Sequence, residues 1–185
     1  DLVNQSLFKQ GGLEVVIIDS NSPQNEYQII KQYLNQYPQI KYKRTDERET
    51  LYKAWNRAID ISEGEYLTSA NTDDRHRTDA LEILSQSLDK FHQYGLVYPD
   101  LLITHKENET FDNNTAAKRY EFPDYNMGTI LSNSVYGAQP VWRRKVHDEI
   151  GYFDDNYKIG GDYELFIRLS RKFGAIHLRE TLGLF

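Results

Sequence analysis

The sequence predicts an α/β domain in which a mostly parallel sheet is flanked by helices. Two observations carry this prediction: apolar runs alternate with segments of helical spacing three times within residues 1–95, and glycine or proline separates them. Such repeated strand and helix pairs are typical of right-handed crossovers between parallel strands. Of the 185 residues, 39% are hydrophobic and 13% aromatic, which is enough for one packed core, so we expect a single domain over residues 1–185.

Composition and charge exclude several classes of protein. The net charge of −6 at pH 7 leaves no overall positive field, so no nucleic-acid partner is expected. The absence of cysteine excludes disulfides, thiolate metal sites and thiol nucleophiles. No run of about 18 apolar residues occurs, so no transmembrane helix is expected in this sequence. The histidines lack the spacing of a zinc-binding helix.

The first strand is expected over residues 13–18, LEVVII, which is apolar and β-branched like a strand buried on both faces. Ser22 is expected to cap the next helix, with Pro23 in its first turn and Pro38 after its end. Residues 39–44 alternate between apolar and polar, which indicates a strand with one solvated face.

A second helix is expected over residues 50–62, because apolar residues recur on one helical face and Gly64 follows. Residues 65–69 are expected to form a third strand, and a third helix should end before Gly95. The inward residues of these two helices are expected to be Leu51, Trp55, Ala58 and Ile59, and then Leu81, Leu84, Leu88 and Phe91.

The second half of the chain is less regular. A helix over residues 160–173 is predicted by inward Leu165, Phe166, Leu169 and Phe173. The other expected elements are a strand over residues 96–105, a polar loop over 106–128, a short strand running into a helix over 139–151, and a final strand over 175–178.

Oxygen-bearing side chains gather directly after the third strand, in the sequence NTDD. Asn71, Asp73 and Asp74 would lie at the carboxyl end of that strand, where such sheets bind ligands, and Asp19 would lie on the same rim. Carboxylate and amide oxygens suit hard cations such as Mg²⁺ or Mn²⁺. The alternative is that the aspartates are turn residues and that Asp79 caps the following helix.

Four stretches, in this order, resemble family 2 glycosyltransferases of the GT-A fold: VVIIDSNS, TLYKAWNRAIDISEGEYL, NTDD and FDDNYKIGGDYELFIRL. Members of that family open with a strand similar to VSVIIPTYN and a helix whose last turn resembles residues 2–8, LVNQSLF. The resemblance implies a GT-A nucleotide-diphospho-sugar transferase fold that lacks this first strand, whose place is in the middle of the sheet, between the strands at 13–18 and 65–69. Unpaired strand edges are costly, so we expect the natural protein to be longer than this sequence. The sequence is then expected to be truncated at both ends.

The resemblance implies an activity and its partners. The expected reaction is inverting, metal-assisted transfer of a sugar from a nucleotide-diphosphate donor to a hydroxyl of a sugar or lipid-linked acceptor, with Mn²⁺ or Mg²⁺ as cofactor. Residues 1–95 would form the nucleotide-binding half and residues 96–185 the acceptor-binding half. Family members often act on polysaccharide or lipid-linked acceptors, which implies a cytoplasmic protein that can contact the membrane periphery.

Roles for acidic residues follow from the same resemblance. Asp73 stands at the position of the family's metal ligand, and Asn71 and Asp74 would lie beside the donor; Asn71 replaces a carboxylate. Asp162 stands where inverting members keep the base that deprotonates the acceptor, a role worth roughly 10²- to 10⁴-fold in rate. An ordinary helix N-cap is the alternative for Asp162. Gly161, which would face the acceptor, replaces a glutamate that is frequent there.

The remaining implied contacts are less specific. Asp19, Ser20, Arg48 and Lys53 stand where the family binds the donor nucleotide, although loop charges are often simply solvated. Trp142 stands where members shape the acceptor pocket, and core packing is its alternative.

Two other functions share these features. A nucleotidyltransferase also combines such a sheet with an acidic metal site, and it would require a glycine- and basic-rich loop after its first strand. A non-catalytic domain that binds a nucleotide or a sugar is favoured by Ser20, Asn71 and Gly161, each of which departs from the family pattern.

Overall fold

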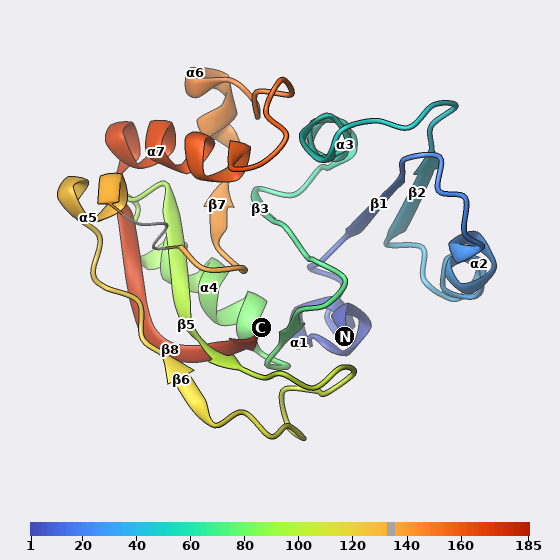
Figure 1. The fold of residues 1–185 in the computed structure, drawn as a ribbon, viewed down its shortest axis with the longest axis horizontal. Coiled ribbons are helices and arrows are strands. Elements are labelled where there is room, and N and C mark those ends of the chain that lie inside the picture. The colour runs from blue at the N-terminus through green and yellow to red at the C-terminus, as the bar shows by residue number, and fades with distance from the viewer. Residues whose placement is uncertain (133–135) are drawn as a thin grey trace.

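The computed structural model of the chain describes residues 1–132 and 136–185, and Figure 1 shows its ribbon. Two sheets carry the fold, with helices packed around them. The helices are η1 (Leu2–Asn4), α1 (Ser6–Lys9), α2 (Glu26–Gln36), α3 (Leu51–Ile61), α4 (Ala80–Lys90), α5 (Met127–Ser132), η2 (Arg144–Val146), α6 (His147–Ile150) and α7 (Gly161–Phe173). The strands are β1 (Val15–Asp19), β2 (Ile40–Arg44), β3 (Tyr66–Thr68), β4 (Arg75–His76), β5 (Leu96–Ile103), β6 (Lys118–Tyr120), β7 (Val141–Arg143) and β8 (Ala175–Leu184).

The smaller sheet pairs β1 with β2 in parallel, with Val15 beside Ile40. The β-branched residues of β1 favour the extended backbone. Helix α3 packs against β1, and it begins where the Thr50 hydroxyl accepts a hydrogen bond from the Lys53 N–H at 3.3 Å. These elements confirm the strand, helix and strand order expected for this part of the chain.

The larger sheet has the order β3-β7-β5-β8-β4, with β6 paired to β5. Within the described residues β5 and β8 are its parallel pair, and the other four pairings are antiparallel. The expected α/β class holds, but the larger sheet is mixed and not mostly parallel. Antiparallel strands need no crossover helix, so the irregular segment between β5 and β7 can supply strands directly.

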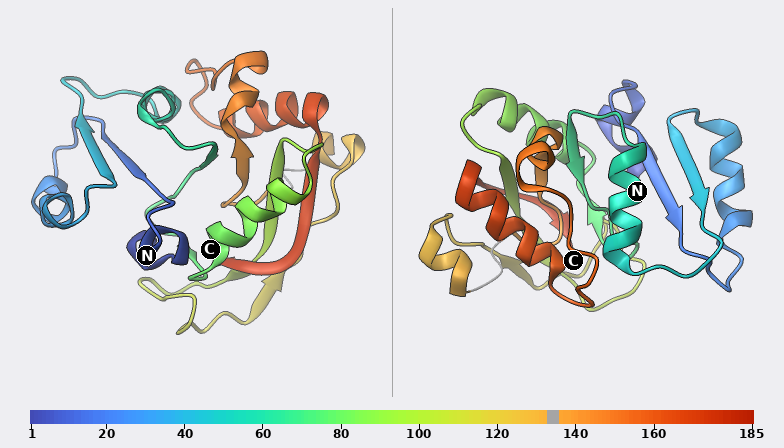
Figure 2. Two further views of the ribbon diagram at one scale, coloured as in Figure 1. Left: turned by 180° about the vertical axis from the view of Figure 1, so that it is seen from behind. Right: turned by 90° about the horizontal axis from the view of Figure 1, so that it is seen from above.

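Alternate residues of β5 pack on opposite faces of the larger sheet. Leu96 and Tyr98 belong to an aromatic-rich core cluster with α7, whereas Val97 belongs to a second cluster with α4. Figure 2 shows α4 and α7 on different sides of the strands. The expected inward residues of these two helices are buried, namely Leu81, Leu84, Leu88, Leu165, Phe166 and Leu169, while Phe91 and Phe173 are half-buried.

Strands β1 and β3 each have one open edge. In the part of the chain that the structure describes, β1 pairs with β2 alone and β3 pairs with β7 alone. The family resemblance implies a further strand between these two, which correspond to the segments expected at 13–18 and 65–69. The two open edges agree with that expectation, which stays a prediction because no described residue occupies the position.

Helix α2 begins later than expected. Its N-cap is Asn25, without a side-chain cap, rather than Ser22. The Ser22 N–H donates to Asp19 Oδ1 at 2.8 Å, and the Ser22 hydroxyl bonds Glu26 at 2.7 Å. These contacts hold Ser22 and Pro23 in the loop after β1, so helical dihedrals begin one turn further on.

Two further details of the sequence prediction are wrong. The segment expected as a loop contains β6 and the start of α5. All three residues of β6 are exposed and the strand pairs with β5 through its backbone, so it leaves no apolar pattern. Leu51, expected to face inward, is 54% exposed, whereas Tyr52 is buried. None of the described helices combines the length and the apolar character needed to cross a membrane.

Candidate active site

Three segments that are distant in sequence meet beside the carboxyl end of β1. The Ser20 hydroxyl accepts a hydrogen bond from the Glu49 N–H at 2.5 Å, which links the end of β1 to the loop before α3. The Tyr52 hydroxyl donates to Asp162 Oδ1 at 3.1 Å, which links the first turns of α3 and α7. In the right view of Figure 2 these two helix starts lie next to each other. The fold thus brings Ser20, the loop before α3 and Asp162 to one rim.

Asp162 is the second residue of α7 and is half-buried. The N-cap of this helix is Gly160, with φ of 77° and no side-chain cap. The alternative that Asp162 is itself the N-cap is therefore wrong. Its carboxylate still lies in the first turn, where the helix dipole favours negative charge.

The loop before α7 is fixed by a residue that the sequence analysis did not single out. The Asn56 side chain donates to the Phe153 carbonyl at 2.9 Å and accepts from the Phe153 N–H at 3.0 Å. On the other side, Arg168 donates to the carbonyls of Ile150 and Tyr152. These contacts give the entry to α7 a defined path.

Tyr52 was also missed, although a signal for it exists. Tyr52, Trp55 and Ile59 recur at i, i+3 and i+7, which marks one helical face. The alternative face that includes Leu51 contains as many apolar residues. In the structure the face with Tyr52 is buried, and the Tyr52 hydroxyl contacts Asp162.

The segment after β3 contains two aspartates in different environments. Asp73 is exposed, whereas Asp74 is 3% exposed and accepts a hydrogen bond from Asn71 Nδ2 at 2.8 Å. Burial raises the pKa of Asp74 above its ordinary value; the Asn71 hydrogen bond opposes this, and the charge of Asp73 adds to it. Asp79 precedes α4 but makes no capping hydrogen bond, and it binds Arg77 instead.

These residues fit a cation that is shared with a diphosphate. Residues 1–132 and 136–185 contain no group of three or more histidine or acidic side chains placed to hold a metal ion. Mg²⁺ is usually bound through one or two carboxylates plus phosphate oxygens and waters, and not by an all-protein cage. The exposed Asp73 carboxylate, next to the Asn71 amide, is a hard oxygen donor of that kind.

Asp19 lies at the end of β1 with both carboxylate oxygens engaged. Oδ2 accepts from the Tyr42 hydroxyl at 2.6 Å and from Arg44 at 2.5 Å, and Oδ1 accepts from the Ser22 N–H. Burial alone would raise the pKa of Asp19, but the hydrogen bonds from Tyr42, Ser22 and Arg44 outweigh it and hold the pKa below its usual value. Three of the roughly four acceptor positions of this carboxylate are therefore occupied, and the remaining one is on Oδ1.

The other residues singled out in the sequence are placed as follows. Lys53 is half-exposed and pairs with Glu49 at 3.4 Å, and Arg48 is exposed in the same loop. Trp142 is 3% exposed, and its Nε1 donates to His147 at 3.0 Å, so core packing accounts for it. Gly161 is buried against the Tyr52 ring.

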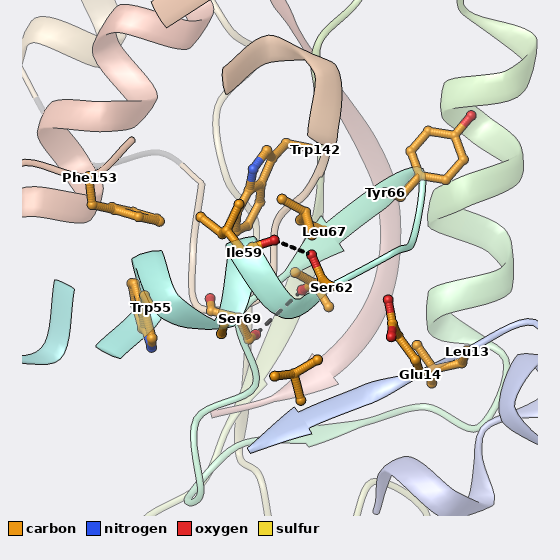
Figure 3. A pocket seen from close by; sticks show the side chains of 13 residues that line it. Leu13, Glu14, Trp55, Ile59, Ser62, Tyr66, Leu67, Ser69, Trp142 and Phe153 are labelled. Atoms are coloured by element: carbon orange, nitrogen blue, oxygen red, sulfur yellow. Dashed lines mark hydrogen bonds between the residues drawn. The ribbon is translucent and has the colours of Figure 1, made fainter. Parts of the chain in front are cut away.

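An apolar slot of about 140 Å³ lies between β1 and β3, under α3 (Figure 3). Val16 lines it from β1, Leu67 from β3 and Trp55 from α3. Its lining is almost free of charged groups, apart from Glu14, so it does not suit a diphosphate. The slot lies at the open edges of β1 and β3. The rim formed by Ser20, the loop before α3 and Asp162 is the better candidate for an active site.

Comparisons with known proteins agree on one family. A family model described as Glycosyl transferase family 2 matches residues 1–151. The putative colanic acid biosynthesis glycosyl transferase WcaA of Escherichia coli (strain K12) is 22% identical over 166 residues, which cover 87% of this chain and 57% of WcaA. The uncharacterized protein y4gI of Sinorhizobium fredii is 22% identical over 156 residues, which cover 84% of this chain and 16% of y4gI.

Solved structures of S. aureus TarS are similar along the whole chain. The complex with UDP has a TM-score of 0.75 at 19% identity and covers 100% of this chain and 54% of that one. The complex with UDP-GlcNAc has a TM-score of 0.77 at 18% identity, with coverage of 100% and 52%. The chain thus spans less than two thirds of each of these relatives. The expected α/β fold of the GT-A type is confirmed.

Proposed function

Because this chain belongs to glycosyl transferase family 2, we propose that it transfers a sugar from a nucleoside-diphosphate donor to a hydroxyl acceptor, with inversion at the anomeric carbon. One observation supports this reaction above the others: the Asp162 carboxylate at the start of α7 is bound by Tyr52 in the first turn of α3, and the loop before α3 is bound to Ser20 at the end of β1. The TarS complexes with UDP and UDP-GlcNAc support a nucleotide sugar as the donor.

In the proposed reaction Asp162 is the general base. Its carboxylate takes the proton of the acceptor hydroxyl, and the acceptor oxygen forms a bond to the anomeric carbon. The bond from that carbon to the phosphate oxygen breaks, and the nucleoside diphosphate leaves with the electron pair. A divalent cation bound at Asp73 would neutralise charge on the diphosphate. Asp74 and Asn71 would hold the Asp73 backbone in place through their mutual hydrogen bond.

The acceptor that we propose is a hydroxyl of a sugar or of a lipid-linked saccharide. The description of WcaA as a putative colanic acid biosynthesis enzyme supports a role in polysaccharide synthesis. A lipid-linked acceptor would bring the protein to the membrane periphery.

The test is Asp162→Asn in the complete protein. Asparagine keeps the shape of the side chain but cannot accept the proton, so kcat should fall by roughly 10²- to 10⁴-fold while the donor Kd changes by less than about twofold. Transfer would be measured with nucleotide sugars chosen by thermal shift, and donor affinity by calorimetry. Asp155→Asn, at an exposed aspartate of the same loop, is the matched control and should leave both values unchanged. Unchanged turnover in Asp162→Asn would remove the base assignment.

A second candidate is a non-catalytic domain that binds a nucleotide or a sugar. The neutral Asn71 in the acidic segment and the engaged carboxylate of Asp19 favour it, since each leaves fewer free carboxylate oxygens to bind a cation. This candidate predicts nucleotide binding without transfer to any hydroxyl acceptor, and with equal affinity in the presence of a chelator.

A further inference from the structure

Asp162 receives one side-chain hydrogen bond, and it comes from Tyr52 at 3.1 Å. We propose that Tyr52 is a positioning residue for the proposed reaction, in which its hydroxyl sets the orientation of the Asp162 carboxylate. This inference rests on the proposed function, because it assumes that Asp162 accepts the acceptor proton. Among residues 1–132 and 136–185 no side chain donates to the other oxygen, Oδ2, which remains for the acceptor hydroxyl.

The Tyr52 ring is itself held in place by packing. It is 3% exposed, stacks on Phe153 with ring centroids 5.8 Å apart and meets the edge of Trp55 at 5.7 Å. Phe153 is in turn fixed through its backbone by Asn56. A phenol anchored in this way offers its hydroxyl in one direction, so the carboxylate that accepts from it has one preferred rotamer.

The absence of a side chain at Gly161 also supports a fixed position for the Tyr52 ring. A Cβ on Gly161 would lie 2.7 Å from Cε2 and 2.9 Å from Cδ2 of Tyr52, closer than real Cβ contacts. The ring therefore occupies the space that a side chain at position 161 would need. Gly161 thus leaves room for the Tyr52 ring, and the Tyr52 hydroxyl contacts the Asp162 carboxylate.

The phenol remains a hydrogen-bond donor at neutral pH. Burial raises the pKa of Tyr52, and the negative charge of Asp162 raises it further. A neutral phenol can donate to a carboxylate, so its hydroxyl is available to orient the Asp162 side chain.

Tyr52→Phe in the complete protein tests the proposal, because phenylalanine keeps the ring and its packing and removes only the hydroxyl. We expect kcat to fall by roughly 10- to 100-fold, with the donor KM and the melting temperature nearly unchanged. Tyr163→Phe is the matched control: its hydroxyl donates to the Ile130 carbonyl instead of Asp162, so kcat should stay within about twofold.

The outcomes separate this inference from the proposed function. If Asp162→Asn is inactive and Tyr52→Phe keeps the wild-type kcat, Tyr52 has no positioning role while the base assignment stands. If Asp162→Asn is fully active, both assignments are overturned. A purely structural role for Tyr52 would instead lower the melting temperature and leave kcat of the folded fraction intact.

A double-mutant cycle tests the steric pairing without any activity measurement. Gly161→Ala should lower the melting temperature in the wild-type background, since the added Cβ meets the Tyr52 ring. The same substitution in a Tyr52→Ala background should lower it much less, because the ring is gone. Equal shifts in the two backgrounds would contradict the pairing of Tyr52 with Gly161.

Discussion

At the scale of single residues, neighbouring aspartates differ in burial and in hydrogen bonding. Asp74 is buried and bound to Asn71, and burial raises its pKa, so it serves to shape the segment after β3. Asp73, one position earlier, is exposed and available to a cation. The same contrast separates Asp19, whose carboxylate is engaged by three donors, from exposed Asp46 in the nearby loop.

Asp73→Ala should weaken metal-dependent nucleotide binding. We expect UDP affinity in Mn²⁺ to fall by about tenfold or more, since the carboxylate proposed to bind the cation is lost, whereas affinity in chelator should stay the same. Calorimetry with UDP would measure both. Asp79→Ala, which removes an acid bound to Arg77 on the following segment, should leave the metal-dependent affinity unchanged. Equal wild-type affinity with and without Mn²⁺ would contradict the cation site.

At the scale of elements, polar side chains connect segments in addition to the backbone pairing between strands. The Asp19 carboxylate joins the end of β1 to β2 through Tyr42 and Arg44. Asn56 joins α3 to the loop before α7. The first contact fixes the end of β1, and the second fixes the loop that leads to Asp162.

Asp19→Asn should lower stability at pH 7 and flatten its dependence on acid. The hydrogen bonds of Asp19 hold its folded pKa below the unfolded value of about 3.9, so its contribution is present above that pH and is lost as the pH falls through the folded pKa. We expect a loss of roughly 1–3 kcal/mol at pH 7 that shrinks in acid. Urea unfolding at several pH values would measure it, with exposed Asp46→Asn as the control. A constant difference between pH 7 and pH 3 would contradict this account.

At the scale of the whole molecule, the edge strands β1 and β3 of the two sheets lie on either side of the apolar slot. The Val15 N–H donates to the Gln39 carbonyl at 3.0 Å, toward β2. Because successive residues of a strand alternate in direction, the N–H groups of Val16 and Ile18 are directed away from β2, toward the open edge of β1. An apolar slot with two unpaired backbone edges suits an added strand better than a polar ligand.

Amide hydrogen exchange should report this open edge. In the 185-residue chain we expect Val16 and Ile18 to exchange at least about tenfold faster than Ile17, since only Ile17 is directed at β2. In a polypeptide extended by the strand that the family resemblance implies, all three should be protected and the melting temperature should rise. Fast exchange of Val16 and Ile18 in the extended protein would contradict a strand in the slot.

Local patterns in the sequence determined much of this fold. The β-branched run of β1, the helical spacing in α4 and α7 and the NTDD segment after β3 were placed correctly, because each depends on residues within a few positions of one another. The start of α2 and strand β6 were not, since side-chain contacts and backbone pairing with distant residues decided them.

The tertiary structure alone decided the details of the candidate site. Asp162 was marked by its resemblance to a family motif, but its partner Tyr52 lies 110 positions away, and no periodicity relates the two. Whether Asp19 was free or engaged, and which face of α3 turned inward, depended on how whole elements packed. A sequence pattern records the preferences of neighbours along the chain, whereas the orientation of a carboxylate depends on neighbours in space.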